Sequence, residues 1–507
     1  MAQPLQSTNL IAPGFKGVNT EDSPIAQDQS FADVADNCVI DKRGRIASRK
    51  GVAMLTTNVG DLTANHLTNV HHFYNDAGAN IVVSTGNNKI FTGDATLTSF
   101  TNPYSITAND WRIVNFNEKV YFFQRDFDPL VYDGTTLSTF STVNSNSTPG
   151  QYKANEVLAA FGRLWVADSS SNTQTVFWSD LLIGNAFTGG SSGSVTITKV
   201  WPDGHDEIVG LAAHNSALII FGRHSIVIYN GATDPTTMVL ADTIAGVGCI
   251  DRNTIQHIGT DVLFLSDDGL RSLGRVIQEK SMPLSDLSKN VKTDLIDSID
   301  KETEPLQSAY SPENTFYLLT FPSQELTYCF DLKGRLENNA FRVTKWPNNS
   351  FKSYGRKNDG TLLIGTSAGI GSYSGFQDTN NPTNPSYRMR YFSPSLTFGD
   401  PSRLKMVKKL RPTLVGGSST NVSLKWAYDF SEIFSSQNIA LGSQNPAFFN
   451  TGEFNIAEFS GGAEITRKSI NANGFGSVVT IGLEADISGE GISIQEINVL
   501  SLIGKTL

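Results

Sequence analysis

A Gly-x-Ser-x-Gly sequence is the first pattern in this chain whose residue types could do chemistry. Residues 365–369 (GTSAG) have the spacing of the turn that presents a nucleophilic serine in α/β-hydrolases. That turn needs a helix after the serine, whereas residues 370–373 (IGSY) have the composition of a strand. All seven histidines also precede Ser367, although the hydrolase order places the histidine last. The pattern therefore predicts a hairpin turn, and we expect no catalytic residue there.

Histidines and cysteines give no metal signature. His71 and His72 are adjacent, so on a strand they face opposite sides and cannot chelate one ion well. The other well-separated histidines match no known ligand spacing. The three cysteines are Cys38, Cys249 and Cys329, and they form no C-x-x-C pair. We expect reduced, buried thiols and no bound metal.

A nucleotide cofactor is not expected either. Residues 246–248 (GVG) lack the third glycine and the strand–helix context of a dinucleotide-binding loop, and no phosphate-binding P-loop sequence is present.

Short acidic clusters could act as paired carboxylates on a sugar. They are residues 126–128 (DFD), 203–206 (DGHD) and 267–269 (DDG). Between strands, such residues more commonly shape turns, and residues 266–273 (SDDGLRSL) fall short of the sialidase Asp-box. Four tryptophans at strand positions could stack on sugars or fill a core: Trp111, Trp165, Trp178 and Trp346. A carbohydrate-binding or glycosidase-type protein therefore remains an alternative.

Composition and charge restrict the class of protein further. The 507 residues include 44 glycines and 10% aromatic residues but only 17% charged residues, which favours many short strands joined by tight turns. A coiled coil, a collagen and a charge-rich disordered chain are excluded. The net charge of −10 argues against a tight binder of duplex DNA. No apolar run approaches a membrane span and no signal peptide is recognised, so we expect synthesis in a cytoplasm and no membrane anchor.

The hydrophobic pattern predicts an all-β fold. From residue 66 to about 375, strands of four to six residues alternate with tight turns, and the unit returns every 40–50 residues or so, as in propeller blades. One inserted helix is expected where Leu284, Leu287, Val291, Leu295 and Ile299 recur at steps of three and four, with Ser285 as its cap.

Four regions follow from these patterns. Residues 1–50 form an N-terminal segment in which Ser30 and Asp33 predict the start of a short helix, and a basic turn follows at residues 42–45. Residues 51–375 form the propeller-like body, and residues 376–385, with two prolines, form a linker. Residues 386–507 alternate apolar and polar positions and predict a β-sandwich-like C-terminal domain.

Several segments together resemble one family. They are residues 17–24 (GVNTEDSP), 35–40 (ADNCVI), 44–51 (GRIASRKG), 162–167 (GRLWVA), 176–180 (VFWSD), 246–250 (GVGCI) and 262–269 (VLFLSDDG). They are similar to segments of the tail nozzle, or tail tubular protein B, β-propellers of short-tailed bacteriophages. The resemblance spans residues 14 to about 300 and, more weakly, strands near residues 400 and 426.

The resemblance implies a non-enzymatic virion protein of the phage tail. It implies a homo-hexameric ring below the portal and adaptor proteins, with a channel through which DNA passes without specific binding, and outer surfaces for tail fibres or spikes. Six copies with a charge of −10 each would carry −60, and we expect acidic side chains to line the channel. The alternative is a receptor-binding propeller that binds or cleaves carbohydrate.

The basic turn suggests that the N-terminal segment docks onto an acidic neighbour in the tail. The residues expected at this contact with the portal or adaptor are Phe15, Asn19, Asn37, Arg43, Arg45, Arg49 and Lys50.

Overall fold

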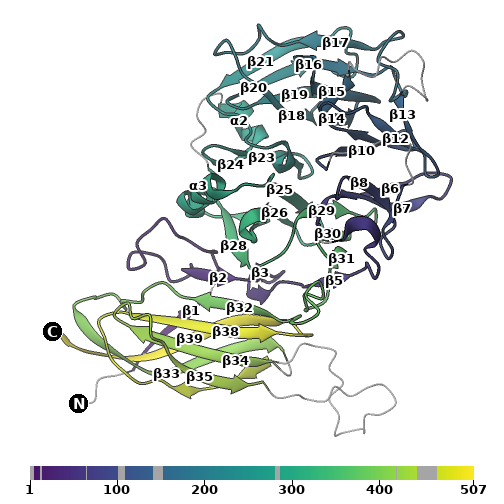
Figure 1. Ribbon diagram of the computed structural model, residues 1–507. Helices are drawn as coiled ribbons and strands as arrows, with labels where there is room; N and C mark the ends of the chain where they lie inside the picture. The colour runs from purple at the N-terminus through teal and green to yellow at the C-terminus, as the bar shows by residue number, and fades with distance from the viewer. Residues whose placement is uncertain are drawn as a thin grey trace, which may run out of the picture.

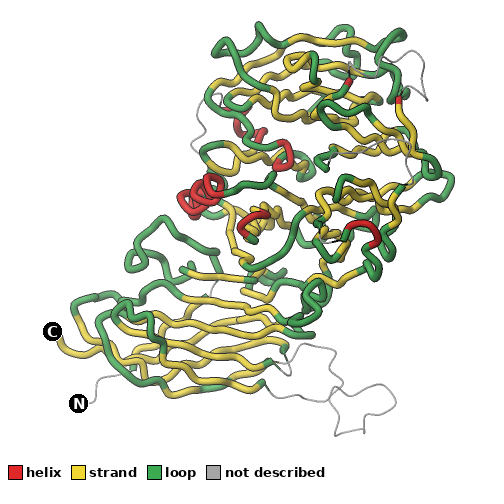
Figure 2. The backbone as a smooth tube through the Cα atoms, viewed as in Figure 1, coloured by secondary structure: helices red, strands yellow, loops and turns green. Residues whose placement is uncertain are grey.

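The protein consists of a β-propeller joined to a β-sandwich (Figure 1). The computed structural model describes residues 5–11, 14–63, 65–100, 109–140, 152–279, 286–417, 420–441 and 465–506. Strands dominate both parts, with a few short helices between them (Figure 2). The predicted all-β class with a propeller body is therefore confirmed.

Six small antiparallel sheets within these ranges form separate blades. The first three are β6 (Leu67–Tyr74), β7 (Asn80–Gly86), β8 (Lys89–Thr92) and β9 (Thr98–Ser99); β10 (Arg112–Phe116), β11 (Lys119–Phe123), β12 (Leu130–Tyr132) and β13 (Leu137–Thr139); and β14 (Ala154–Ala160), β15 (Arg163–Ser169), β16 (Asn172–Trp178) and β17 (Gly193–Thr196). The next three are β18 (Ile208–His214), β19 (Ala217–Gly222), β20 (Ser225–Asn230) and β21 (Val239–Ala245); β22 (Gln256–His257), β23 (Val262–Ser266) and β24 (Gly269–Ser272); and β29 (Ser353–Arg356), β30 (Leu362–Thr366) and β31 (Gly369–Tyr373) with β5 (Val52–Met54).

A seventh blade position is filled by a sheet that continues beyond the propeller. It consists of β25 (Gln307–Ser311), β26 (Phe316–Phe321), β27 (Leu326–Arg335) and β28 (Phe341–Pro347). β25 packs against β29, and β29 packs against β6, which closes the circle. β5 comes from before the first blade and supplies the outer strand of the last one, so the two ends of the propeller sequence are held together.

Turn chemistry explains the hairpins within the blades. Asn87–Asn88 and Asn117–Glu118 connect neighbouring strands, and all four residues have positive φ, as two-residue type I′ turns require. Alternating apolar residues fill the space between blades, and every residue of β15 is buried.

Helix α3 (Lys292–Lys301) lies within the predicted helical segment. Its Leu295 is buried, and so is Val291 just before its first residue. A further short helix, α2 (Leu273–Glu279), was not expected. Leu284 and the proposed cap Ser285 lie outside the described residues.

The sandwich contains two sheets that share one core. One is β32 (Tyr387–Phe392), β38 (Val479–Ile487), β34 (Asn421–Tyr428) and β35 (Ser435–Ala440); the other is β39 (Ile492–Thr506) and β33 (Arg403–Gly416) with β36 (Ile465–Arg467) and β37 (Ile470–Asn471). Leu424 and Leu483 of the first sheet and Leu410 and Ile494 of the second belong to the same buried cluster. The predicted sandwich-like C-terminal domain is thus present.

The N-terminal segment pairs with strands of both the propeller and the sandwich. β1 (Gln6–Leu10) pairs with β39, and the hairpin of β3 (Cys38–Ile40) and β4 (Ile46–Ser48) extends the same sheet. β2 (Val34–Asp36) lies between β28 and β32, and so joins the seventh blade and one sandwich sheet into a nine-stranded sheet. The helix predicted after Ser30 is therefore wrong: pairing on both sides overrides the local helical spacing.

Candidate functional site

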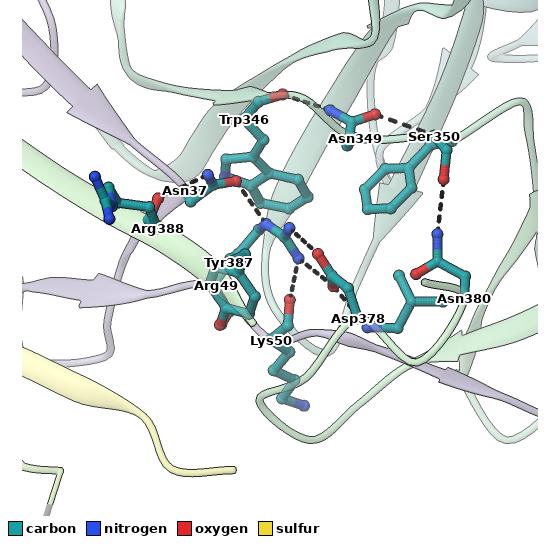
Figure 3. Close-up of polar contacts among 12 residues, drawn as sticks. Asn37, Arg49, Lys50, Trp346, Asn349, Ser350, Asp378, Asn380, Tyr387 and Arg388 are labelled. Carbon is teal, nitrogen blue, oxygen red and sulfur yellow. Dashed lines mark hydrogen bonds and ion pairs between the residues drawn. The ribbon is translucent and has the colours of Figure 1, made fainter. Parts of the chain in front are cut away.

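A buried arginine holds the propeller and the sandwich together. Only 1% of Arg49 is exposed. Its Nη1 and Nη2 donate to the two carboxylate oxygens of Asp378 at 2.9 and 2.6 Å, and its Nε donates to Asn37 Oδ1 at 2.9 Å (Figure 3). Nη1 also donates to the carbonyl of Lys50 at 2.9 Å, and the guanidinium lies 4.0 Å from the ring centroid of Tyr387.

These partners come from distant parts of the sequence. Asn37 has a positive φ of 52°, between β2 and β3, and its amide donates to the carbonyl of Arg388 on β32 at 2.9 Å. Asp378 lies in the linker, and Tyr387 begins β32. Burial alone would lower the pKa of Arg49, but the hydrogen bond and charge of Asp378 outweigh it and raise the pKa. The guanidinium of Arg49 therefore stays charged, and the carboxylate of Asp378 pairs with it.

A polar hollow of about 500 Å³ borders this cluster. Asn348, Asn349 and Ser350 line it from the propeller, and Arg388 and Arg390 line it from β32. The Asn380 amide donates to Ser350 Oγ at 2.7 Å across it (Figure 3). This hydrogen bond holds the linker against the propeller. The polar groups around the hollow can therefore help to position the two parts of the molecule.

Four of the seven predicted docking residues are buried inside the chain. They are Phe15, Asn19, Asn37 and Arg49. Phe15 packs edge-on against Tyr391, and Asn19 accepts from the Glu21 backbone amide at 3.0 Å. Their side chains stabilise this fold and are covered by it.

The other three lie at the surface. Arg43 is exposed in the β3–β4 turn, and Arg45 pairs with Asp41 at 2.6 Å beside it. Lys50 is partly exposed near Glu313, 3.6 Å away. Arg43 and Arg45 also line a hollow on the sandwich together with Arg467 and Glu496. We call this surface the arginine face.

Two glycines of the family-like segments make backbone approaches that a side chain would block. Gly17 has a φ of 93°, and a Cβ there would lie 2.6 Å from the Val343 backbone nitrogen on β28. A Cβ on Gly51 would overlap the backbone of Gln377. Both glycines therefore belong to the join between the two parts.

The axis of the propeller is closed at one end, where the innermost strand of each blade, such as β10 or β14, begins. Short helix η3 (Arg252–Thr254) places Arg252 there, only 6% exposed. Its guanidinium pairs with Asp110, before β10, at 2.9 Å and donates to Asn155 Oδ1 on β14 at 2.8 Å. On the opposite side, Ser308 of β25 donates to the carbonyl of Asn253 at 2.5 Å. These contacts span the circle from side to side.

A further buried charge adjoins this closure. Glu156 on β14 is 1% exposed and lies 3.4 Å from Arg112 Nε on β10. Burial raises the pKa of Glu156, although the charges of Arg112 and Arg252 oppose the shift. Sequence reasoning missed this cluster, because no motif links Arg112, Glu156 and Arg252.

At the other end, where the innermost strands finish, the axis opens into a hollow of about 650 Å³, which we call the axial cup. His71 on β6 and Asn115 on β10 form a hydrogen bond of 2.9 Å in its wall. His72 lies on the opposite face of β6 and contacts Asn80 Oδ1 at 2.6 Å, as predicted for adjacent histidines.

The other chemical candidates have structural roles. Residues 365–369 form the β30–β31 hairpin, with a strand after Ser367, as predicted. Asp206 organises a turn, accepting from the His224 backbone at 2.9 Å and from Ser225 Oγ at 2.6 Å. The four tryptophans named above are all buried, and all three cysteines are free and buried.

Among the described residues, no group of three or more His, Cys, Asp or Glu side chains could hold a metal ion. No helix in the same part of the chain has the length and apolar character needed to cross a membrane.

Comparison with known proteins yields only distant similarity in fold. No family model matches the chain, and no curated protein does. Among solved structures, PorZ of Porphyromonas gingivalis, a surface component of the type-IX secretion system, is 12% identical over 61% of this chain and 37% of its own, with a TM-score of 0.36. A streptogramin B lyase is 10% identical over 62% and 95% (TM-score 0.37), and the WD40 domain of Neurospora crassa Pan2 is 10% identical over 64% and 95% (TM-score 0.36). Identities and TM-scores this low support no conclusion about function.

Proposed function

We propose that this chain is a non-enzymatic structural protein of a phage tail, the subunit of a nozzle ring of six copies below the portal and adaptor. The observation that carries the proposal is the position of the family-like segments. Residues 17–24 and 35–51 lie in the join between propeller and sandwich, with Gly17, Arg49 and Gly51 at its tightest contacts. The segments that carry the similarity thus build the framework of this chain, which supports the proposal.

The closed propeller axis gives the proposal a definite geometry. Because Arg252 and its partners fill the axis, a single propeller offers DNA no passage. In the proposed ring, the channel lies between copies and is lined by outer surfaces of the chains. Residues 51–375 contain 22 Lys and Arg against 32 Asp and Glu, whereas the rest of the chain contains 17 of each. An acidic channel would therefore be lined by the propellers, and the phosphate backbone would slide past them.

Antibody–gold labelling of intact particles, viewed by negative-stain electron microscopy, tests the location. Gold at the distal end of a short tail is expected. Label on fibres would favour the receptor-binding alternative, and absence of label on particles that retain the epitope would refute a virion role. Cryo-electron microscopy of the purified chain tests the ring: six-fold particles with an acidic channel are expected, and a basic channel would contradict the proposal.

Docking onto the portal and adaptor is assigned to the arginine face. Removing residues 1–50 would delete four strands, so that truncation unfolds the chain and cannot test docking. The variant R43E reverses a charge on an exposed side chain and is expected to weaken assembly onto the portal–adaptor complex. R388E, which alters an exposed arginine on β32, is the matched control. Equal assembly by R43E and the unmodified chain would refute this contact.

A further inference from the structure

The axial cup has the dimensions of a small-molecule site and an unusual charge. Its volume of about 650 Å³ lies in the range of about 300–1,000 Å³ typical of ligand pockets. No Asp or Glu is among the described residues that line it, although the propeller as a whole is acidic. Arg356, Lys357, His71, His72 and His257 all line it. A cup of this kind disfavours a cationic ligand and favours an anion.

One cation in the cup is available to a ligand. Lys357 pairs with Asp94 at 3.0 Å, so its charge is already compensated. Arg356, the last residue of β29, pairs with Leu362 through its backbone, and its exposed guanidinium forms no hydrogen bond or ion pair with the described residues. Its planar guanidinium matches a carboxylate or phosphate with two parallel hydrogen bonds.

The imidazoles supply hydrogen bonds in place of charge. Burial lowers the pKa of His71 to about 4, with the Asn115 hydrogen bond opposing the shift. Burial and the neighbouring His214 lower the pKa of His257 as well. At neutral pH both rings are uncharged. Nε2 of His71 is already bonded to Asn115, whereas the ring of His257 has no hydrogen bond to the described residues and can donate one and accept one, as a hydroxyl-rich ligand requires.

Amides and aromatic rings complete the lining. The Asn358 amide and the Gln256 Oε1 provide further hydrogen-bonding groups, whereas the Asn115 amide is already used by His71 and by the carbonyl of His72. Tyr74, which is 52% exposed, and Tyr310 provide ring faces beside them. Apolar ring faces next to paired donors and acceptors suit the two sides of a sugar ring.

We propose that the axial cup binds a small acidic sugar, with its carboxylate or phosphate on Arg356 and its hydroxyls on His257, Gln256 and Asn358. The inference concerns one propeller and does not depend on ring formation. A free sugar acid, a sugar phosphate and the end of an acidic glycan share this chemistry.

Isothermal titration calorimetry on the full-length chain tests the proposal with four probes: glucuronate, glucose 6-phosphate, glucose and inorganic phosphate. Glucuronate or glucose 6-phosphate is expected to bind at least about tenfold more tightly than glucose and inorganic phosphate, which is about 1.4 kcal/mol. Preference between the two sugars shows whether the natural anion is a carboxylate or a phosphate.

Two variants locate the binding. R356Q is expected to weaken affinity for the preferred sugar about tenfold or more with an unchanged melting temperature, because Arg356 holds no other part of the fold. R403Q alters an exposed arginine on the sandwich and should bind as the unmodified chain does. The proposal is overturned if neither acidic sugar binds at millimolar concentration, if glucose or phosphate alone binds equally well, or if R356Q retains full affinity.

Discussion

Arg49 is the residue whose loss should cost the fold most. Removing one partner of a buried, hydrogen-bonded ion pair leaves the other charged and unpaired, which typically costs about 3–5 kcal/mol. R49M is therefore expected to lower the free energy of unfolding by about this amount, as measured by urea denaturation. The double variant R49M/D378N should recover part of the loss, because it also removes the stranded carboxylate.

An exposed pair provides the control for Arg49. Arg388 and Asp486 form an ion pair at 2.8 Å with both side chains more than half exposed. Such pairs contribute about 0–1 kcal/mol, so R388Q should change stability little. An R49M variant no less stable than R388Q would contradict the role given to the buried arginine.

Asp33 should make stability depend on pH. Burial raises the pKa of this carboxyl from 3.8 to about 6, and its Oδ1 is buried without a hydrogen-bond partner among the described residues. The folded chain then holds the proton more tightly than the unfolded chain does. The stabilisation from Asp33 is complete below about pH 4 and is lost as the pH rises through about 6.

The variant D33N isolates this effect. Relative to the unmodified chain, D33N is expected to gain stability between about pH 4 and pH 6 and to keep a constant advantage above that range. Urea midpoints measured across these pH values test it, with D203N at an exposed turn as control. A pH-independent difference would refute the assignment.

At the scale of elements, β5 is the strand on which closure of the propeller depends. Ala53 pairs with Ser372 of β31, while the amides of Val52 and Met54 point away and donate to Asp378 and Thr379. A proline at position 53 removes the amide that faces β31. A53P is therefore expected to open this blade.

Hydrogen–deuterium exchange measures that opening. In A53P, amides of β30 and β31 should exchange faster, and the melting temperature should fall. A53G keeps the amide and should show a smaller change. Unaltered protection of β31 in A53P would show that the circle closes without β5.

The local pattern predicted the blades well because their pairings are local. Strand, two-residue turn and strand follow one another within about 20 residues, so turn residues such as Asn117 and the apolar alternation of β11 define each hairpin. The helical spacing around Leu295 is equally local.

The same pattern failed where partners are distant. Val34 pairs with Phe392, and Asp36 pairs with Lys345. The residues next to Val34 and Asp36 in the sequence do not predict either pairing. For the same reason the sequence around Arg49 suggests a surface contact, because nothing near it reveals Asp378. The axial cup is assembled from five blades, and no spacing predicts it.

For the whole molecule, the distribution of charge predicts weak contact with nucleic acid. The propeller carries the entire excess of negative charge, and affinity for duplex DNA comes chiefly from cations that neutralise phosphates. The purified chain is expected not to retard duplex DNA in a gel-shift assay at physiological ionic strength. A basic DNA-binding protein serves as positive control, and a salt-resistant shift would contradict passage without binding.

The pairing of the N-terminal segment with β39 also determines when the protein can fold during its synthesis. Ile46 pairs with Ile494, about 450 residues later in the chain. At about 5–20 residues per second, the ribosome needs roughly 20–90 s to deliver that partner. The β3–β4 hairpin therefore remains unpaired along one edge until the ribosome has synthesised β39. Ribosome stalling or premature termination should yield chains whose early strands stay exposed to chaperones and proteases, so that only translation through β39 releases a protected molecule.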